Sequence, residues 1–264
     1  MIAILGTGKM GEALLSGLLR AGREPAELAV VVRREARADE LRAAYGVPVV
    51  TAEEAAKDAA TIVVAVKPQD MAAMLDQIAG RVTASQLVIS LAAGITTSFI
   101  EQRLGAEVPV VRVTTNTPLL VNEGMSVISA GSFAADAHLQ TAQELLSPVG
   151  KVVRLPEYQQ DAATALAGSG PAYVYYLIEA MADAGVLVGM PRRTALELVT
   201  QTVYGAALMV RDSGEHPVLL REAVTSPGGT TIAATRELER HAVRGAFFAA
   251  IEAARDRGRE LGGS

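Results

Sequence analysis

A glycine-rich turn near the start of the chain has the spacing of a nucleotide-binding loop. The apolar run Ile2–Leu5 leads into the sequence GTGKMG, and a helical pattern follows from Glu12 to Arg20. In this GxGxxG spacing, the first glycine makes the tight turn, the second admits a pyrophosphate, and the third lets the helix pack on the strand. The N–H groups at the helix start attract anions. The loop therefore predicts a dinucleotide site formed by Gly6, Thr7, Gly8, Lys9, Met10 and Gly11.

The end of the second apolar run indicates which dinucleotide binds. Loops that select NAD usually carry an acidic residue here, which accepts the ribose 2′-hydroxyl. This chain instead has Arg33 and Arg34, followed by Arg37. Two guanidinium groups match a 2′-phosphate, so we predict NADPH as the preferred cofactor, with NADH possible. The alternative is a solvated basic turn beside Glu35.

Small residues and prolines follow three further apolar runs, at the strand ends where doubly wound sheets bind their ligands. The segments read VKPQ at residues 66–69, AAG at residues 92–94 and NTP at residues 116–118. A rigid backbone with small side chains suits the flat ring of a nicotinamide. The alternative is structural, because Pro68 and Pro118 can simply end strands and begin helices.

A second glycine turn stands in the C-terminal half. Residues 225–231 read TSPGGTT and precede a helical pattern over residues 232–238. Glycines at a helix start expose consecutive N–H groups to an anion, and the hydroxyls of Thr230 and Thr231 can cap the helix or touch a ligand. The turn indicates a carboxylate site, with an ordinary capped helix as the alternative.

The sequence lacks the proton donors and nucleophiles of several enzyme classes. No tyrosine stands in a Tyr-x-x-x-Lys pair, and the Walker A, HExxH, Cys-x-x-Cys and GxSxG patterns are absent. This disfavours P-loop ATPases, zinc hydrolases and serine esterases, and no metal site is predicted. His216 lies in a loop that could belong to a site, but capping that loop explains it equally well. Reducing a ketone requires a nearby acid, whereas a protonated imine requires only orientation.

The composition is that of a globular protein with one large or two modest domains. The 264 residues are 50% hydrophobic and 20% charged, with a formal net charge of −5. Interspersed charges predict no nucleic-acid or membrane partner, and the longest uncharged stretch, residues 162–178, is shorter than the about 20 residues of a membrane span. The absence of cysteine, and of a secretory or transit segment before Ile2, leads us to expect a cytoplasmic protein.

Apolar runs alternate with helical patterns up to residue 155, as in βαβ units. Beyond Pro156 the sequence predicts only helices, over residues 159–187, 192–211, 217–224, 231–240 and 242–261. The second of these is apolar on two sides, which indicates a subunit interface. We predict an α/β fold with a Rossmann-like, doubly wound, mostly parallel sheet over residues 1–157 and an all-α domain over residues 158–264. The expected strands are Met1–Leu5, Leu28–Val32, Ile62–Val66, Leu87–Leu91, Val108–Val113, Met125–Ala130 and Lys151–Leu155.

Together these segments resemble the pyrroline-5-carboxylate reductase family over nearly the whole chain. The most specific is SPGGTT at residues 226–231, supported by GSGPAY at residues 168–173 and VKPQ at residues 66–69. The chain departs from the family at Thr114-Thr115, where Met-Pro is common, and at Glu222, where aspartate is common. The family reduces Δ1-pyrroline-5-carboxylate to L-proline with NAD(P)H, the last step of proline biosynthesis. The resemblance implies this reaction, and a homodimer with an interlocked helical dimerisation domain that often assembles into a larger ring.

The resemblance also implies roles for single residues. The hydroxyl of Thr231 would meet the pyrroline nitrogen as the catalytic contact, while nearby N–H groups hold the carboxylate and Glu157 borders the proline site. Such loops can come from the partner subunit. The implied substrate-binding residues are Glu157, Ser226, Gly229, Thr230 and Thr231, and the implied dinucleotide contacts beyond the glycine loop are Val66, Lys67, Pro68, Ala93 and Asn116.

Two other functions remain as alternatives. The first is a reductase of a related cyclic imino acid; a β-hydroxyacid reductase is disfavoured because it would need a donor such as lysine, and no lysine follows Lys151. The second is a dinucleotide-binding regulatory protein without activity. That alternative explains the first glycine turn but leaves the SPGGTT turn without a role.

Overall fold

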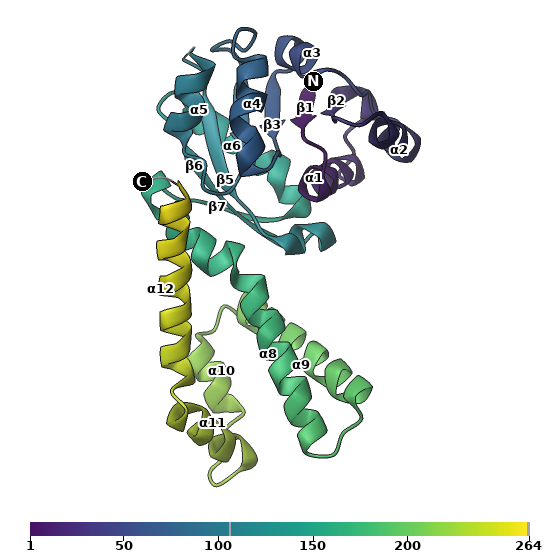
Figure 1. Cartoon of the computed structure of the whole chain (residues 1–264). Helices are drawn as coiled ribbons and strands as arrows, with labels where there is room; N and C mark the ends of the chain where they lie inside the picture. Colours follow the sequence, from purple (N-terminus) through teal and green to yellow (C-terminus); the bar gives the residue numbers. More distant parts are fainter. Residues whose placement is uncertain (106, 263–264) are drawn as a thin grey trace. The chain divides into compact units, whose positions relative to one another are not determined.

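The computed structural model describes residues 1–105 and 107–262, the last two by their backbone alone. Packing divides the chain into two compact units (Figure 1). One unit comprises residues 1–169 together with the residues from 254 on, and the other comprises residues 170–253. The functional boundary expected at residue 157 stays a prediction.

The first unit is built on one seven-stranded sheet in the order β2-β1-β3-β4-β5-β6-β7. Strands β1 to β5 are parallel, β6 runs antiparallel to β5, and β7 is parallel to β6. This confirms the Rossmann-like, mostly parallel sheet, and every strand begins and ends within two residues of its predicted position. The strands are β1 (Ile2–Leu5), β2 (Leu28–Val31), β3 (Thr61–Val64), β4 (Leu87–Ser90), β5 (Val110–Thr114), β6 (Gly124–Ala130) and β7 (Gly150–Arg154).

Helices cover both faces of this sheet, which is why its first five strands are buried at every position. On one face, Met71, Leu75 and Ile100 pack against the strands. On the other face, Leu14 and Leu145 do so. The helices are α1 (Lys9–Arg20), α2 (Glu35–Tyr45), α3 (Ala52–Asp58), α4 (Pro68–Ile78), α5 (Thr97–Leu104) and α6 (Asp136–Leu146).

The chain after β7 forms an irregular helical segment where one long helix over residues 159–187 was predicted. A 3-10 turn (Glu157–Gln159) leads into α7 (Gln160–Ala163), then a π turn (Thr164–Gly168), and only then α8 (Gly170–Leu187). The prediction was wrong in this detail because side chains at the end of β5 and just after it form hydrogen bonds to the π turn. Thr114 bonds the hydroxyl of Thr164, and Asn116 donates to the carbonyl of Ala167. These bonds act in place of a regular helical ladder.

The second unit is helical, and its helices after α8 lie within two residues of their predicted ranges. They are α8, α9 (Arg192–Ser213), α10 (Pro217–Ala223), α11 (Thr230–Arg240) and the start of α12 (Val243–Gly262). Helices α8 and α9 pack closely, since a Cβ on Gly185 would lie 2.8 Å from that of Ala195.

A single copy of the helical unit leaves its large apolar side chains exposed. Within residues 170–253, Ala182 and Ala195 are the hydrophobic residues that are buried. Exposed side chains include Tyr176 at 74%, Leu187 at 86% and Phe248 at 64%. Apolar surface of this extent marks an interaction face, in agreement with the two-sided apolar pattern of the predicted helix 192–211.

Candidate active site

The first glycine turn has the geometry that its spacing predicts. Gly6 has φ +88°, and a Cβ there would lie 2.6 Å from Val66 Cγ1, so only glycine fits. A Cβ on Gly11 would lie 2.8 Å from the Gly6 carbonyl oxygen, at the point where α1 packs against the turn. A Cβ on Gly8 would meet nothing within 4 Å. The space next to Gly8, at the N-terminus of α1, is therefore open to a ligand.

A cleft of about 880 Å³ runs from this turn past the ends of β2 and β3. Of the predicted dinucleotide contacts, some line the cleft and some lie outside it. Those that line it are Gly6, Thr7, Gly8, Arg33, Arg34, Val66 and Lys67; those outside it are Lys9, Met10, Gly11, Pro68, Ala93 and Asn116.

The three arginines after β2 have different partners. Arg33 forms an ion pair with Asp70 in the first turn of α4, at 2.9 Å. Arg37 bonds to Glu40 and to Glu12, and hydrogen bonding to Glu40, above all, raises the pKa of its guanidinium. Within the described part of the chain, Arg34 forms no ion pair. Arg37 is thus neutralised by the protein, whereas Arg34 stands exposed on the cleft with its charge unmatched.

The other predicted strand-end residues lie on turns whose conformation the protein fixes. Ala93 is exposed between β4 and α5, beside Gly94 with φ +75°. The Asn116 side chain donates to the Ala167 carbonyl at 3.0 Å and accepts from the Met125 N–H at 2.9 Å. The amide of Asn116 is therefore held by the backbone on both sides.

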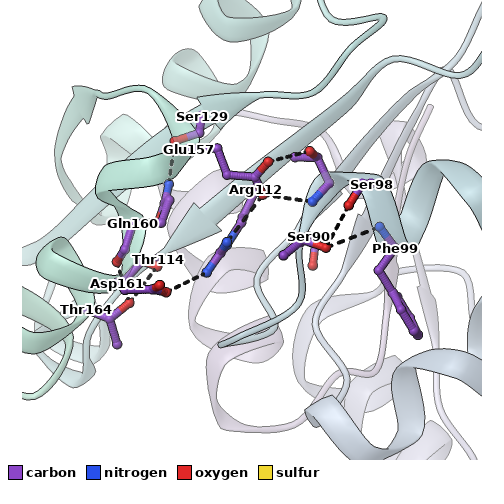
Figure 2. Close-up of polar contacts among 12 residues, drawn as sticks. Ser90, Ser98, Phe99, Arg112, Thr114, Ser129, Glu157, Gln160, Asp161 and Thr164 are labelled. Atoms are coloured by element: carbon purple, nitrogen blue, oxygen red, sulfur yellow. Dashed lines mark hydrogen bonds and ion pairs between the residues drawn. The ribbon is translucent and has the colours of Figure 1, made fainter. Parts of the chain in front are cut away.

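Glu157 lies in a polar cluster on the first unit (Figure 2). Its carboxylate accepts hydrogen bonds from the Thr97 N–H at 2.8 Å and the Thr97 hydroxyl at 2.6 Å. It also pairs with Arg112 at 3.3 Å, and Arg112 pairs with Asp161 at 3.5 Å. The Arg112 side chain is only 5% exposed. Arg112 and Thr97 were not among the predicted site residues, although the charge of Arg112 within the apolar run of β5 was a visible signal.

The SPGGTT turn belongs to the second unit and directly precedes α11. Gly229 occupies the N-cap position, so no side-chain hydroxyl caps this helix. A Cβ on Gly229 would lie 2.3 Å from Ser226 Oγ and 3.2 Å from the Ser226 carbonyl oxygen, so a side chain there would displace the Ser226 hydroxyl. The first N–H groups of α11 have no intrahelical acceptor, so the turn presents amides next to the Thr230 and Thr231 hydroxyls. The helix start is therefore capped by glycine and not by a hydroxyl, and an ordinary capped helix stays the alternative to a carboxylate site.

His216 caps helix α10, which was one of the two roles predicted for it; the other was a place in a ligand site. Its Nδ1 accepts a hydrogen bond from the Val218 N–H at 3.3 Å, at the start of α10. Among the residues described, no group of three or more His, Cys, Asp or Glu side chains is placed to hold a metal ion. None of the described helices combines the length and apolarity required to cross a membrane.

Comparison with known proteins identifies the family. Residues 157–261 match the model described as pyrroline-5-carboxylate reductase dimerisation, and residues 1–94 match the model described as NADP oxidoreductase coenzyme F420-dependent. A pyrroline-5-carboxylate reductase of Corynebacterium melassecola is 43% identical over 265 residues, covering 99% of this chain and 98% of the relative. The chain belongs to the pyrroline-5-carboxylate reductase family.

Solved structures agree with this assignment. A pyrroline-5-carboxylate reductase from Coxiella burnetii shares 35% identity with a TM-score of 0.94, covering 98% of this chain and 97% of that one. A Plasmodium falciparum pyrroline carboxylate reductase with NADP bound shares 30% identity with a TM-score of 0.85, covering 99% and 97%. The predicted family and fold class are confirmed.

Proposed function

We propose that this protein reduces Δ1-pyrroline-5-carboxylate to L-proline with NADPH, the last step of proline biosynthesis. The observation that carries the proposal is 43% identity along 99% of the chain to an enzyme named for this reaction. The open space at Gly8 and the amide-rich turn before α11 supply the two ligand sites that the reaction requires.

The residues of the cleft fit NADPH. The pyrophosphate would lie in the open space beside Gly8, where the start of α1 favours an anion, and Arg33 and Arg34 would hold the 2′-phosphate. NADH lacks that phosphate and would bind more weakly. When bound, the cofactor supplies the hydride. The proposed contacts are Gly6, Thr7, Gly8, Lys9, Met10, Gly11, Arg33, Arg34, Val66, Lys67, Pro68, Ala93 and Asn116, with Val66–Pro68 and Ala93 facing the nicotinamide.

The turn before α11 would hold the substrate. We assign the substrate carboxylate to the amides of Thr230 and Thr231, next to Gly229, and the pyrroline nitrogen to the hydroxyl of Thr231. Ser226 would shape the turn, since its carbonyl accepts from the Gly229 N–H at 3.1 Å, and Glu157 would border the site. Fixing the five-membered ring at two points places its imine carbon for attack, and such positioning supplies much of the reduction of the barrier. The charge on a protonated imine removes the need for a strong acid, in agreement with the absence of one in the sequence.

Two copies of the chain would associate through their helical units. A dimer would bury apolar side chains that one copy leaves exposed, among them Tyr176, Leu187 and Phe248. Residues 157–261 also match the family model for pyrroline-5-carboxylate reductase dimerisation. As the family resemblance implies, we propose a homodimer that assembles into a larger homo-oligomer. A cysteine-free chain of this kind suits a reducing compartment such as the cytoplasm.

The proposed function is tested by following NADPH absorbance after pyrroline-5-carboxylate is added to the purified protein, with NADH in parallel. We expect rapid, saturable oxidation with proline as the product, faster at low cofactor concentration with NADPH. Binding of NADPH without turnover of this substrate would contradict the assignment and favour another cyclic imine or the regulatory alternative.

Replacing both Arg33 and Arg34 by alanine should weaken NADPH binding about 10- to 100-fold. Each charge-assisted hydrogen bond contributes about 1.5–3 kcal/mol, and compensation by neighbouring residues reduces the net loss of binding energy. NADH affinity should change less than twofold, because NADH has no 2′-phosphate. Titration of both dinucleotides by calorimetry gives the two dissociation constants. Arg42→Ala is the matched control, because Arg42 lines the same cleft but pairs with Glu35 and Asp39. Equal losses for both cofactors would exclude the phosphate role.

Replacing Asp70 by asparagine should strengthen NADPH binding. The Asp70 carboxylate neutralises Arg33, and a 2′-phosphate must compete with it. Because the pair is exposed, we expect an increase of about two- to fivefold at low ionic strength, fading as salt is added. NADH affinity should stay constant. The control is Asp76→Asn on the same helix, where the carboxylate pairs instead with Arg103. Weaker NADPH binding in the Asp70 variant would show that this ion pair does not oppose the phosphate.

A further inference from the structure

We propose that Glu157 is a positioning residue, which fixes the turn between β4 and α5 and thereby the backbone at Ala93. The inference rests on the proposed function, in which Ala93 faces the nicotinamide. In this proposal the Glu157 carboxylate positions the Ala93 backbone through its bonds to Thr97. This role is additional to the proposed place of Glu157 at the border of the substrate site.

The carboxylate of Glu157 acts as a second cap for α5, supplied from 60 residues further along the chain. The Thr96 hydroxyl already caps this helix by accepting from the Phe99 N–H at 3.2 Å. Glu157 accepts from the Thr97 N–H and, with its other oxygen, from the Thr97 hydroxyl. Thr97 is itself only 4% exposed. Two bonds to one buried residue define where the turn ends and the helix begins.

Arg112 holds the Glu157 carboxylate in this position. Arg112 lies on β5 between the buried residues Val111 and Val113, and its guanidinium reaches Glu157 and Asp161 at 3.3 and 3.5 Å (Figure 2). A buried charge that loses its partner is costly, so the pair resists separation. The two carboxylates share one arginine, yet only Glu157 bonds to Thr97.

A series of polar contacts prevents the segment that carries Glu157 from sliding along the sheet. Alternate residues at the end of β5 and beyond it, namely Arg112, Thr114 and Asn116, meet residues at helical spacing on this segment. Gln160 anchors it a second time, since its Nε2 donates to the Val127 carbonyl at 3.2 Å and to Ser129 Oγ at 2.7 Å on β6. Glu157 is therefore presented to Thr97 from a rigid support.

The turn that results is fixed at both ends. At its start, Ser90 lies in β4 and its hydroxyl accepts from the Ala92 N–H at 3.3 Å. At its end, Thr97 is bonded to Glu157. Between these points the chain has one residue with positive φ, Gly94. In this proposal the two anchored ends limit how far the exposed Ala93 can move, and a displacement of about 1 Å at a reacting edge can cost about 100-fold in rate.

The test compares Glu157→Gln with Asp161→Asn. Each variant removes one negative charge beside Arg112, but only the first weakens the bonds to Thr97. The neutral amide keeps one accepting oxygen, without the charge that strengthens these bonds, and its nitrogen cannot accept from the Thr97 hydroxyl. In hydrogen exchange of the protein without cofactor, we expect the amides of residues 92–97 to exchange about tenfold faster in Glu157→Gln, and at the wild-type rate in Asp161→Asn. We expect kcat to fall about tenfold in the first variant alone, with the NADPH dissociation constant and the KM for the imine within twofold of wild type.

Three outcomes would overturn the inference: unchanged exchange in Glu157→Gln, equal effects in both variants, or a rise in the imine KM with kcat unchanged, which would mean direct substrate contact. If Glu157→Gln does not fold, Thr97→Ala replaces it, with faster exchange and a kcat loss of about threefold expected. An unchanged Thr97→Ala variant would again overturn the inference. The exchange measurement needs no turnover, so an inactive wild-type protein would refute the proposed function without deciding this point.

Discussion

Gly8→Glu will remove dinucleotide binding while the protein stays folded. The backbone at Gly8 has φ −81° and ψ −162°, which any residue adopts, and a Cβ there would meet nothing within 4 Å. The unfolding free energy should therefore stay within about 0.5 kcal/mol of wild type. A carboxylate in this space would occupy and repel the pyrophosphate. We expect at least about a 100-fold loss of affinity, equivalent to about 2.8 kcal/mol, for both NADPH and NADH.

Two other glycines provide the comparison. Gly80 also has no neighbour within 4 Å of a Cβ but lies outside the cleft, so Gly80→Glu should bind both dinucleotides normally. Gly6→Ala should instead lower stability, because it combines φ +88° with a 2.6 Å contact to Val66. Calorimetric titration and thermal unfolding separate the three variants. Normal NADPH affinity in Gly8→Glu would mean that the pyrophosphate does not lie at the start of α1.

Thr231→Ala will slow the reaction and leave cofactor binding intact. In the proposed site its hydroxyl bonds to a nitrogen that carries positive charge, and losing a bond to a charged group costs about 1–3 kcal/mol. The loss in kcat/KM should be about 5- to 150-fold by the same conversion. The NADPH dissociation constant should not change, because Thr231 is proposed to bond to the imine and none of the proposed dinucleotide contacts lies on α11.

Two substitutions on the same helix control for general damage. Thr231→Ser keeps the hydroxyl and should retain most of the activity. Thr235→Ala, one turn further along α11, removes a hydroxyl that already bonds to the Thr231 carbonyl at 3.0 Å and should have little effect. Wild-type kcat/KM in Thr231→Ala would remove this hydroxyl from the mechanism.

The sheet and the cofactor turn could be predicted because their determinants are local in sequence. A strand buried on both faces, such as β1, is apolar throughout. The turn between β1 and α1 needs glycine because Gly6 has φ +88°. The SPGGTT turn could be predicted for the same reason, since the contact between Gly229 and Ser226 lies within four residues of sequence.

Other features depend on residues that are far apart in the sequence, and no local sequence pattern predicts them. The Arg33–Asp70 pair forms across the cleft, and the Glu157–Thr97 bonds connect the helical segment to a turn in the sheet unit. The π turn before α8 follows from side chains on β5. Each pairing requires the strand order, which places β2 and β3 on either side of β1 and brings β4, β5 and β6 together, and which local sequence does not specify.

The most direct test of the central claim is transfer of the label from NADPH deuterated at both C4 positions to proline. The proposed reaction predicts proline heavier by one deuterium, located on the ring carbon that was double-bonded to nitrogen, when the protein is incubated with pyrroline-5-carboxylate. Mass spectrometry detects both the mass and the position. Oxidation of the labelled cofactor without deuterated proline, or no oxidation by a protein that binds NADPH, would contradict the claim.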